Sequence, residues 1–141
     1  MTSATAEAAA EDHARPSRAP APGGFGPPAP ASLDVGVIGN CAYSALVDAR
    51  GRVVWCCLPR FDGEPVFNAL LDPGADASAW AIEIEDFASS TQWYEPNTAV
   101  LRTRLYDSAG QGIEITDLAP RFHSRSRYFR PLTMVGRVKP I

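Results

Sequence analysis

Ala45-Leu46-Val47-Asp48-Ala49-Arg50-Gly51-Arg52-Val53-Val54-Trp55-Cys56-Cys57-Leu58 is the stretch that decides the fold. An apolar run at 45–47 and a second run at 53–58 that contains two valines and a tryptophan flank a short polar segment, a pattern that is typical of two strands joined by a tight loop. Gly51 supplies the positive φ that such a loop usually needs. The stretch therefore predicts a β-hairpin.

More strands are expected on both sides of this hairpin. Residues 80–85 alternate apolar and polar positions, and residues 99–106 and 112–118 flank a loop at 107–111. A further strand is expected at 132–138, and one short helix at 65–71, with a proline in its first turn. Short strands separated by frequent turns predict a mainly β protein, an antiparallel β-sandwich.

Several short segments occur in a fixed order that resembles the N-terminal segment of glycoside hydrolase family 15, the glucoamylases, glucodextranases and trehalases. The segments are Ile38-Gly39-Asn40, residues 45–48, 51–62, 66–72 and 94–101, Ile115-Thr116-Asp117-Leu118-Ala119-Pro120-Arg121-Phe122, Arg130-Pro131-Leu132 and Val135-Gly136-Arg137-Val138. Together they cover nearly everything after Leu33.

The resemblance implies a function for the complete protein, namely inverting hydrolysis of an α-linked glucoside. In the family the two catalytic glutamates lie on an α/α barrel that follows this region. We therefore expect residues 33–141 to be a partial sandwich, truncated at its C-terminal end. We expect it to contain no catalytic residue, to be inactive alone, and to need that barrel in cis or from a split gene. The alternative is a non-catalytic structural or carbohydrate-binding module.

Residues 1–32 differ in composition from the rest. They are rich in alanine and proline, with Phe25 as their one large apolar residue beyond the initiator methionine, so they predict a disordered leader. Glu7, Glu11 and Asp12 interrupt any secretory signal, and no apolar run is long enough to span a membrane. The expected location is cytoplasmic, without membrane association.

The charge is unevenly distributed. Residues 1–120 carry 16 acids and 7 bases, whereas 121–141 carry 6 bases and no acid. A basic tail is one property of nucleic-acid-binding proteins, but this one has no recognisable binding fold and part of it alternates like a strand, so no nucleic-acid partner is expected. Cys41, Cys56 and Cys57 lack metal-ligand spacing and are expected to be buried reduced thiols. Neither a metal nor a cofactor is predicted.

The candidate substrate-binding residues are Arg60, Phe61 and Asp62. They place a cation, a ring and a carboxylate in a turn after a predicted buried strand, and sugars are bound by such sets. The competing interpretation is an Arg60–Asp62 pair that pins the loop, with Phe61 filling the core.

Two further groups of residues are candidates for catalysis or sugar binding. Glu83 and Glu85 project from one face of a predicted strand at a spacing that glycoside hydrolysis can use, but the simpler expectation is that they face water. The aromatic pair Trp93-Tyr94 is a second candidate carbohydrate surface.

A rival interpretation of residues 35–39 is the first strand and turn of a dinucleotide-binding unit. Cys41 and Ser44 stand where further glycines are needed, and too few residues follow for a crossover helix. This interpretation is therefore disfavoured.

Overall fold

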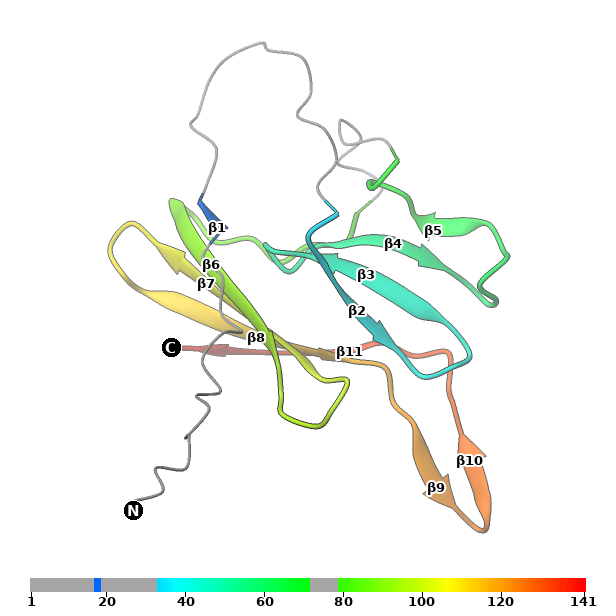
Figure 1. Cartoon of the computed structure of the whole chain (residues 1–141). Coiled ribbons are helices and arrows are strands. Elements are labelled where there is room, and N and C mark those ends of the chain that lie inside the picture. Colours follow the sequence, from blue (N-terminus) through cyan, green and yellow to red (C-terminus); the bar gives the residue numbers. More distant parts are fainter. Residues whose placement is uncertain (1–16, 19–32, 72–78) are drawn as a thin grey trace, which may run out of the picture.

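The regular structure of the described residues consists of β-strands. The computed structural model describes residues 17–18, 33–71 and 79–141. One sheet has the strand order β2-β3-β4-β5, formed by Val35–Gly39, Ser44–Asp48, Val53–Cys57 and Pro65–Phe67. A second has the order β1-β6-β7-β8-β11, formed by Ser17–Arg18, Phe87–Tyr94, Leu101–Asp107, Gly112–Leu118 and Val135–Pro140. A separate hairpin pairs β9, Phe122–Ser124, with β10, Arg127–Phe129 (Figure 1).

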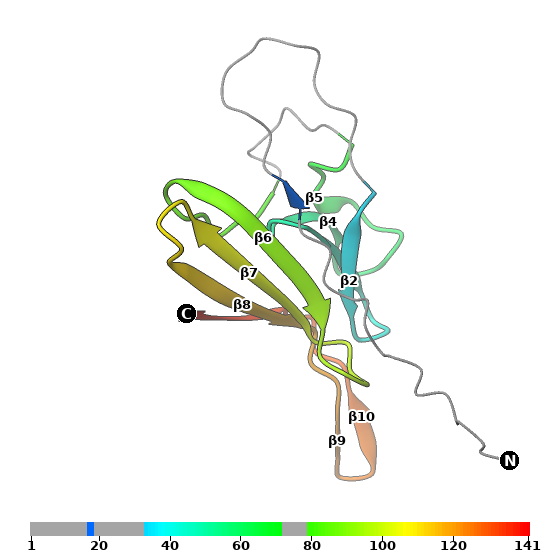
Figure 2. The ribbon, with the colours of Figure 1, turned by 60° about the vertical axis from the view of Figure 1, so that its left-hand side comes forward.

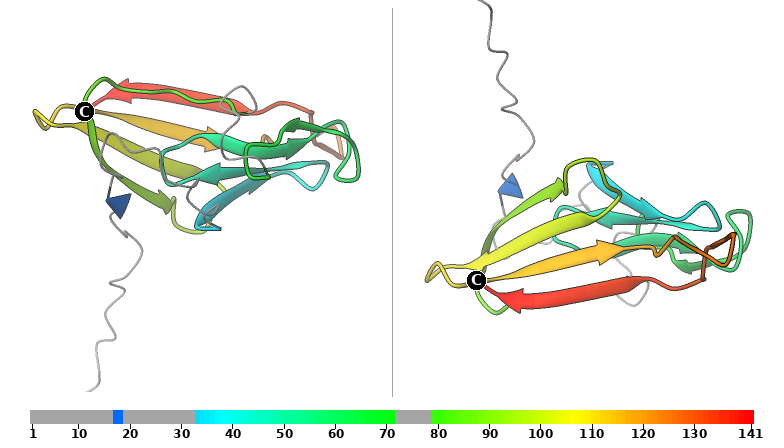
Figure 3. Two further views of the ribbon diagram at one scale, coloured as in Figure 1. Left: turned by 90° about the horizontal axis from the view of Figure 1, so that it is seen from above. Right: turned by 90° about the horizontal axis from the view of Figure 1, so that it is seen from below.

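The two larger sheets lie as two layers (Figures 2 and 3), and the β9–β10 hairpin projects away from both (Figure 2). All strand pairings are antiparallel. The core between the layers is formed by Ile38, Tyr43, Ala45, Val47, Val53, Cys56 and Leu101. The predicted mainly β, sandwich-like antiparallel fold is confirmed.

The hairpin expected from the opening stretch is present as β3 and β4. Gly51 has a φ of +75° in the connecting turn. The Asp48 carboxylate organises this turn, because Oδ1 accepts hydrogen bonds from the backbone N–H of Arg50 and Arg52, each at 2.9 Å. Its Oδ2 accepts a further bond from Arg52 Nε at 2.8 Å. The turn is therefore held by local contacts, as its sequence suggests.

Other expected elements need correction. Residues 65–71 are not a helix: Pro65–Phe67 forms β5 along the edge of β4, where Phe67 pairs with Cys56 and Pro65 with Cys57, so tertiary pairing overrides the local helix-start signal. Residues 80–85 are not a strand, although Trp80 makes an isolated bridge to Val53. The last strand begins at Val135 rather than at residue 132.

Strand β6 was not predicted, because its sequence FASSTQWY lacks the alternation of apolar side chains. Its inward positions are polar. Ser90 is buried, and Gln92 Nε2 donates to Thr103 Oγ1 at 3.0 Å and to the Asp48 carbonyl at 2.8 Å, which joins the two sheets.

Of the predicted leader at 1–32, all but Ser17–Arg18 lies outside the described residues. Cys56 and Cys57 are buried, whereas Cys41 is exposed, contrary to expectation, because it occupies a turn at a φ of 69°.

No helix long and apolar enough to cross a membrane occurs in the described part of the chain. Strand β2 turns directly into antiparallel β3, which excludes the parallel unit that dinucleotide binding needs.

Candidate functional site

The predicted sugar-binding residues Arg60, Phe61 and Asp62 lie together in an exposed turn. Arg60 Nε and Nη2 donate to the two carboxylate oxygens of Asp62, each at 2.9 Å. The two side chains are 76% and 70% exposed. Phe61 is 57% exposed, so the idea that it fills the core is wrong. The loop thus presents a ring beside a preformed ion pair.

The second candidate surface is divided between the two faces of β6. Trp93 lies under the Arg104 guanidinium, whose carbon is 4.9 Å from the ring centroid. The Tyr94 hydroxyl instead bonds the backbone N–H and carbonyl of Val37 at 2.6 and 2.9 Å. Because neighbouring residues of a strand point to opposite faces, the two rings do not form one sugar-stacking surface.

Glu83 and Glu85 are exposed, whereas the isoleucine before each of them, Ile82 and Ile84, is partly covered. The simpler expectation, that the glutamates face water, is confirmed. Among the described residues, no group of three or more histidine, cysteine or acidic side chains is placed to hold a metal ion.

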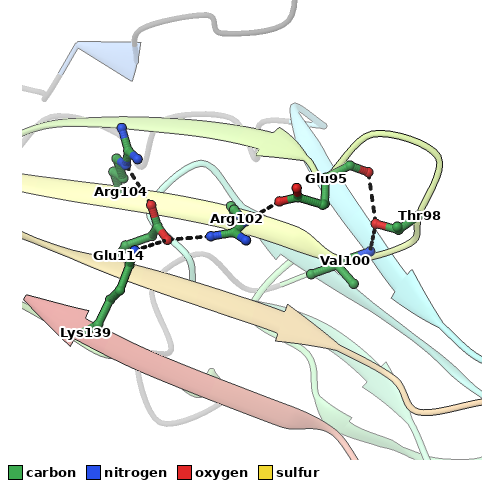
Figure 4. Close-up of polar contacts among 7 residues, drawn as sticks. All are labelled: Glu95, Thr98, Val100, Arg102, Arg104, Glu114 and Lys139. Carbon is green, nitrogen blue, oxygen red and sulfur yellow. Dashed lines mark hydrogen bonds and ion pairs between the residues drawn. The ribbon is translucent and has the colours of Figure 1, made fainter. Parts of the chain in front are cut away.

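Strand β8 carries two buried carboxylates, and the first is fully satisfied. Glu114 lies on the outer face, where it accepts bonds from Arg102 at 2.6 Å, Arg104 at 2.8 Å and Lys139 at 3.0 Å (Figure 4). Glu95 also pairs with Arg102, at 2.6 Å. Burial alone raises the pKa of Glu114, but hydrogen bonds from the three cations outweigh it and lower the pKa to about 2. The network joins strands β7, β8 and β11.

The second carboxylate, Asp117, has no such support. It lies on the inner face, opposite Leu101 on one side and Gly136 on the other. It is 1% exposed, and neither carboxylate oxygen has a hydrogen-bond partner among the residues that the structure describes. Burial raises its pKa to about 6. Because Glu114 and Asp117 point to opposite faces, they cannot flank one glycosidic bond as two catalytic carboxyls do.

Asn40 fastens the base of the projecting hairpin. Its buried Nδ2 donates to the carbonyls of Pro120 at 3.0 Å and Pro131 at 2.8 Å, which flank the hairpin on its two sides. Its Oδ1 accepts a bond from Ala42 N–H at 3.0 Å. The nearby Tyr43 hydroxyl donates to the Thr133 carbonyl at 2.7 Å.

A hollow of about 570 Å³ lies beside this base. Its lining is mostly apolar and includes Ala99, Val100, Leu118, Ala119 and Pro120, with Asn40, Cys41, Arg121 and Phe122 also contributing. Arg121 Nη1 lies 3.5 Å from Cys41 Sγ, and its guanidinium carbon is 5.1 Å from the centre of the Tyr128 ring. The hollow is therefore open to an apolar side chain and bordered by a cation.

Comparison with known proteins identifies the family. Residues 25–130 match the family described as trehalase-like, N-terminal. The chain belongs to this family. It is 42% identical over 86 residues to trehalase 1 of Sulfolobus acidocaldarius, a match that covers 61% of this chain and 15% of that protein. It is 41% identical over 61 residues to the trehalase of Mycolicibacterium smegmatis, a match that covers 40% of this chain and 9% of that protein. It is 33% identical over 91 residues to the trehalase of Thermoplasma volcanium, a match that covers 60% of this chain and 14% of that protein.

The trehalase-like N-terminal domain thus spans at most 15% of the length of these curated relatives. No solved structure matches it. The sequence resemblance is confirmed at the level of a trehalase-like N-terminal domain.

Sequence reasoning missed the residues that organise this trehalase-like domain most strongly. Asn40, Glu114 and Asp117 stood within or beside the segments that carried the resemblance, but none was assigned a role. The local pattern gives no signal for Glu114, because Ile82-Glu83-Ile84 has the same pattern as Ile113-Glu114-Ile115 and yet Glu83 is exposed.

Proposed function

We propose that this chain is the N-terminal β-sandwich domain of a family 15 glycoside hydrolase, and that the complete protein hydrolyses an α-linked glucoside. The observation that carries the proposal is the match to trehalase-like N-terminal domains over residues 25–130. The curated relatives that share this segment are named trehalases. A glucoamylase-like preference for longer α-glucosides is a variant of the same proposal.

The domain acts with a catalytic partner, an α/α barrel in cis or from a split gene, and is inactive alone. Two features support this part of the proposal. The chain spans 15% or less of the relatives' length. Its two buried carboxylates lie on opposite faces of β8 and so cannot act on one bond. A cytoplasmic location belongs to the proposal as well, because all three cysteines are free thiols.

Two measurements test the proposal. The purified chain, incubated with trehalose, maltose or soluble starch, is expected to release no glucose. A fusion in which this chain replaces the matched region of the Sulfolobus acidocaldarius trehalase is expected to hydrolyse trehalose. Glucose release by the isolated chain that persists through further purification contradicts its inactivity. A folded but inactive fusion contradicts the assignment as an interchangeable enzyme domain.

The second candidate function is a non-catalytic carbohydrate-binding module. It is favoured by the exposed Phe61 ring beside the Arg60–Asp62 pair, because an apolar ring beside charged groups is how proteins recognise sugars. Titration of the isolated chain with maltose by calorimetry tests it, with Phe61→Ala and Asp62→Ala as variants. Saturable heat that both substitutions abolish supports a binding module, and the absence of heat excludes this role for maltose.

A further inference from the structure

The β9–β10 hairpin and its flanking residues, 121–130, form an arm that contributes to neither large sheet. Its strands pair only with each other, through Phe122 opposite Phe129, His123 opposite Tyr128 and Ser124 opposite Arg127. All ten residues are exposed except the partly covered Ser124, and the arm extends away from the body in both Figures 1 and 2. A two-stranded hairpin without a covering surface is marginally stable in water, so an arm of this kind needs a partner.

The charge of the arm is unlike that of the rest of the chain. It carries Arg121, Arg125, Arg127 and Arg130 and no acid, and none of these four arginines forms an ion pair with a residue that the structure describes. On the body, by contrast, most of the described cations are paired with carboxylates, namely Arg52, Arg60, Arg102, Arg104 and Lys139, although no such pair is formed by Arg50 or Arg137 with a described residue. Outside the arm the sequence has 16 acids and 9 bases. The unpaired cations of the arm therefore fit an acidic partner.

The aromatic side chains of the arm lie on both of its faces. The rings of Phe122 and Phe129 stack at 5.5 Å and 13° and are 51% and 43% exposed. On the opposite face, His123 contacts Tyr128, which is 64% exposed. Arginine and tyrosine are enriched at the energetic centres of protein interfaces. A surface that covers both faces must enclose the arm, as a groove does.

The base of the arm holds it in place for such a contact. Asn40 bonds the carbonyls on either side of the arm, and the 570 Å³ hollow lies beside the point where β9 begins. Phe122 and Arg121 belong to both the arm and the lining of the hollow. The arm and the hollow thus form one continuous surface, with an apolar recess at the base and arginines toward the tip.

We propose that this surface docks the domain onto the glycoside hydrolase domain of the complete protein, by insertion of the arm into an acidic groove. The inference rests on the proposed function for the existence of that domain. The curated relatives support an occupant in the same polypeptide, since at least 85% of the length of each lies outside the match. A nucleic acid is disfavoured because the chain outside the arm has a net charge of −7, which repels a polyanion. A second copy is disfavoured because Arg121 at the hollow repels an incoming arginine-rich arm.

Chymotryptic cleavage after Phe122, Tyr128 and Phe129, located by mass spectrometry, reports whether the arm is covered. It is measured in the intact 141-residue chain and in the fusion with the Sulfolobus trehalase. We expect at least ten-fold slower cleavage of the arm in the fusion. The variant Arg127→Glu is expected to restore fast cleavage, whereas the matched control Arg137→Glu, an exposed arginine on β11, is not. Equal cleavage rates in the chain and the fusion overturn the proposal.

The remaining outcomes also decide the question. Protection of the isolated chain that increases with its own concentration indicates a second copy, and protection by polyuridylate indicates nucleic acid; either result overturns the proposal. If the fusion does not fold, the chain is mixed with the separately expressed remainder of the Sulfolobus trehalase, and absence of protection there overturns it. A protected but inactive fusion contradicts the proposed function and supports the docking arm. An active fusion with an unprotected arm supports the function and refutes the docking arm.

Discussion

Replacing Asp117 by asparagine is expected to stabilise the domain at neutral pH. The carboxylate is 1% exposed and neither oxygen accepts a hydrogen bond. Its neighbours across the sheet are Leu101 and Gly136, which offer no charge. A charge held without a partner in such a place is unfavourable, so the folded domain retains the proton on Asp117 to a higher pH than the unfolded chain does.

The size of the effect follows from the displaced pKa. The pKa rises from the ordinary value of 3.8 to about 6 in the folded domain. Each unit corresponds to about 1.4 kcal/mol, so the free energy of unfolding is expected to fall by about 3 kcal/mol as the pH rises through this range. Because the pKa of Asp117 is raised in the folded domain, its contribution to the free energy of unfolding is fully present below about pH 4 and is lost progressively up to about pH 6. Asparagine has nearly the same shape and does not ionise, so this loss is absent from the variant.

The assay is urea unfolding at pH 4, 5, 6 and 7, followed by tryptophan fluorescence, for the natural chain and Asp117→Asn. We expect the difference in unfolding free energy between the two proteins to grow by about 2.4 kcal/mol from pH 4 to pH 7, since part of the total change lies below pH 4. Asp107→Asn is the control, because Asp107 has a carboxylate oxygen that accepts bonds from Ala109 N–H at 2.9 Å and Gln111 N–H at 2.8 Å in an exposed turn. A difference that stays constant across this range refutes the reasoning, because it means that Asp117 titrates alike in the folded and unfolded chains.

Four further predictions concern the other organising residues. Glu114→Gln is expected to lower the unfolding free energy at pH 7 by about 1–3 kcal/mol, because three cations lose the buried carboxylate that they share. In urea titrations the difference from the natural chain should shrink as the pH is lowered toward the Glu114 pKa of about 2. Asn40→Ala is expected to cost about 2–3 kcal/mol in the same measurement and to accelerate amide exchange in residues 121–130, whereas unchanged exchange contradicts its clamping role. Ser126→Gly is expected to slow exchange in the arm roughly five-fold, since Ser126 has a φ of 62° that glycine adopts with about 1 kcal/mol less strain, and unaltered or faster exchange opposes this. Asp62→Ala is expected to change the stability of the isolated chain by less than about 1 kcal/mol, because its pair with Arg60 is exposed. A sugar-binding role predicts that the same substitution in the active fusion lowers kcat/KM by the equivalent of about 1–3 kcal/mol, and normal kinetics exclude that role.

The parts of the fold that were predicted correctly depend on local chemistry. The hairpin of β3 and β4 is recognisable because Asp48 and Gly51 organise the turn through bonds within five residues. The hairpin of β7 and β8 follows the same pattern, with Asp107 and Gly110 in its turn. The partial cover of Ile82 and Ile84 and the exposure of Glu83 and Glu85 also follow from alternation, although the segment is not a strand.

The errors arose where long-range pairing outweighed local preference. Residues 65–67 have a helical start signal, yet the edge of β4 provides hydrogen-bond partners that make them a strand. Strand β6 has no apolar alternation, and it is held by β7 along its length and by Gln92 across the sandwich. Phe61 was a plausible core residue until the structure placed its loop at the surface.

The sequence by itself determined the fold class and the family, since turn chemistry, strand alternation and short ordered segments are properties of neighbouring residues. The tertiary structure alone decided which polar residues are buried and which partners they have. Glu114 and Asp117 are three positions apart on one strand, yet one is enclosed by three cations and the other by apolar surface. Asn40 bonds residues 80 and 91 positions away. Burial and pairing at such separations depend on which strands the fold brings side by side, and no local pattern contains that information.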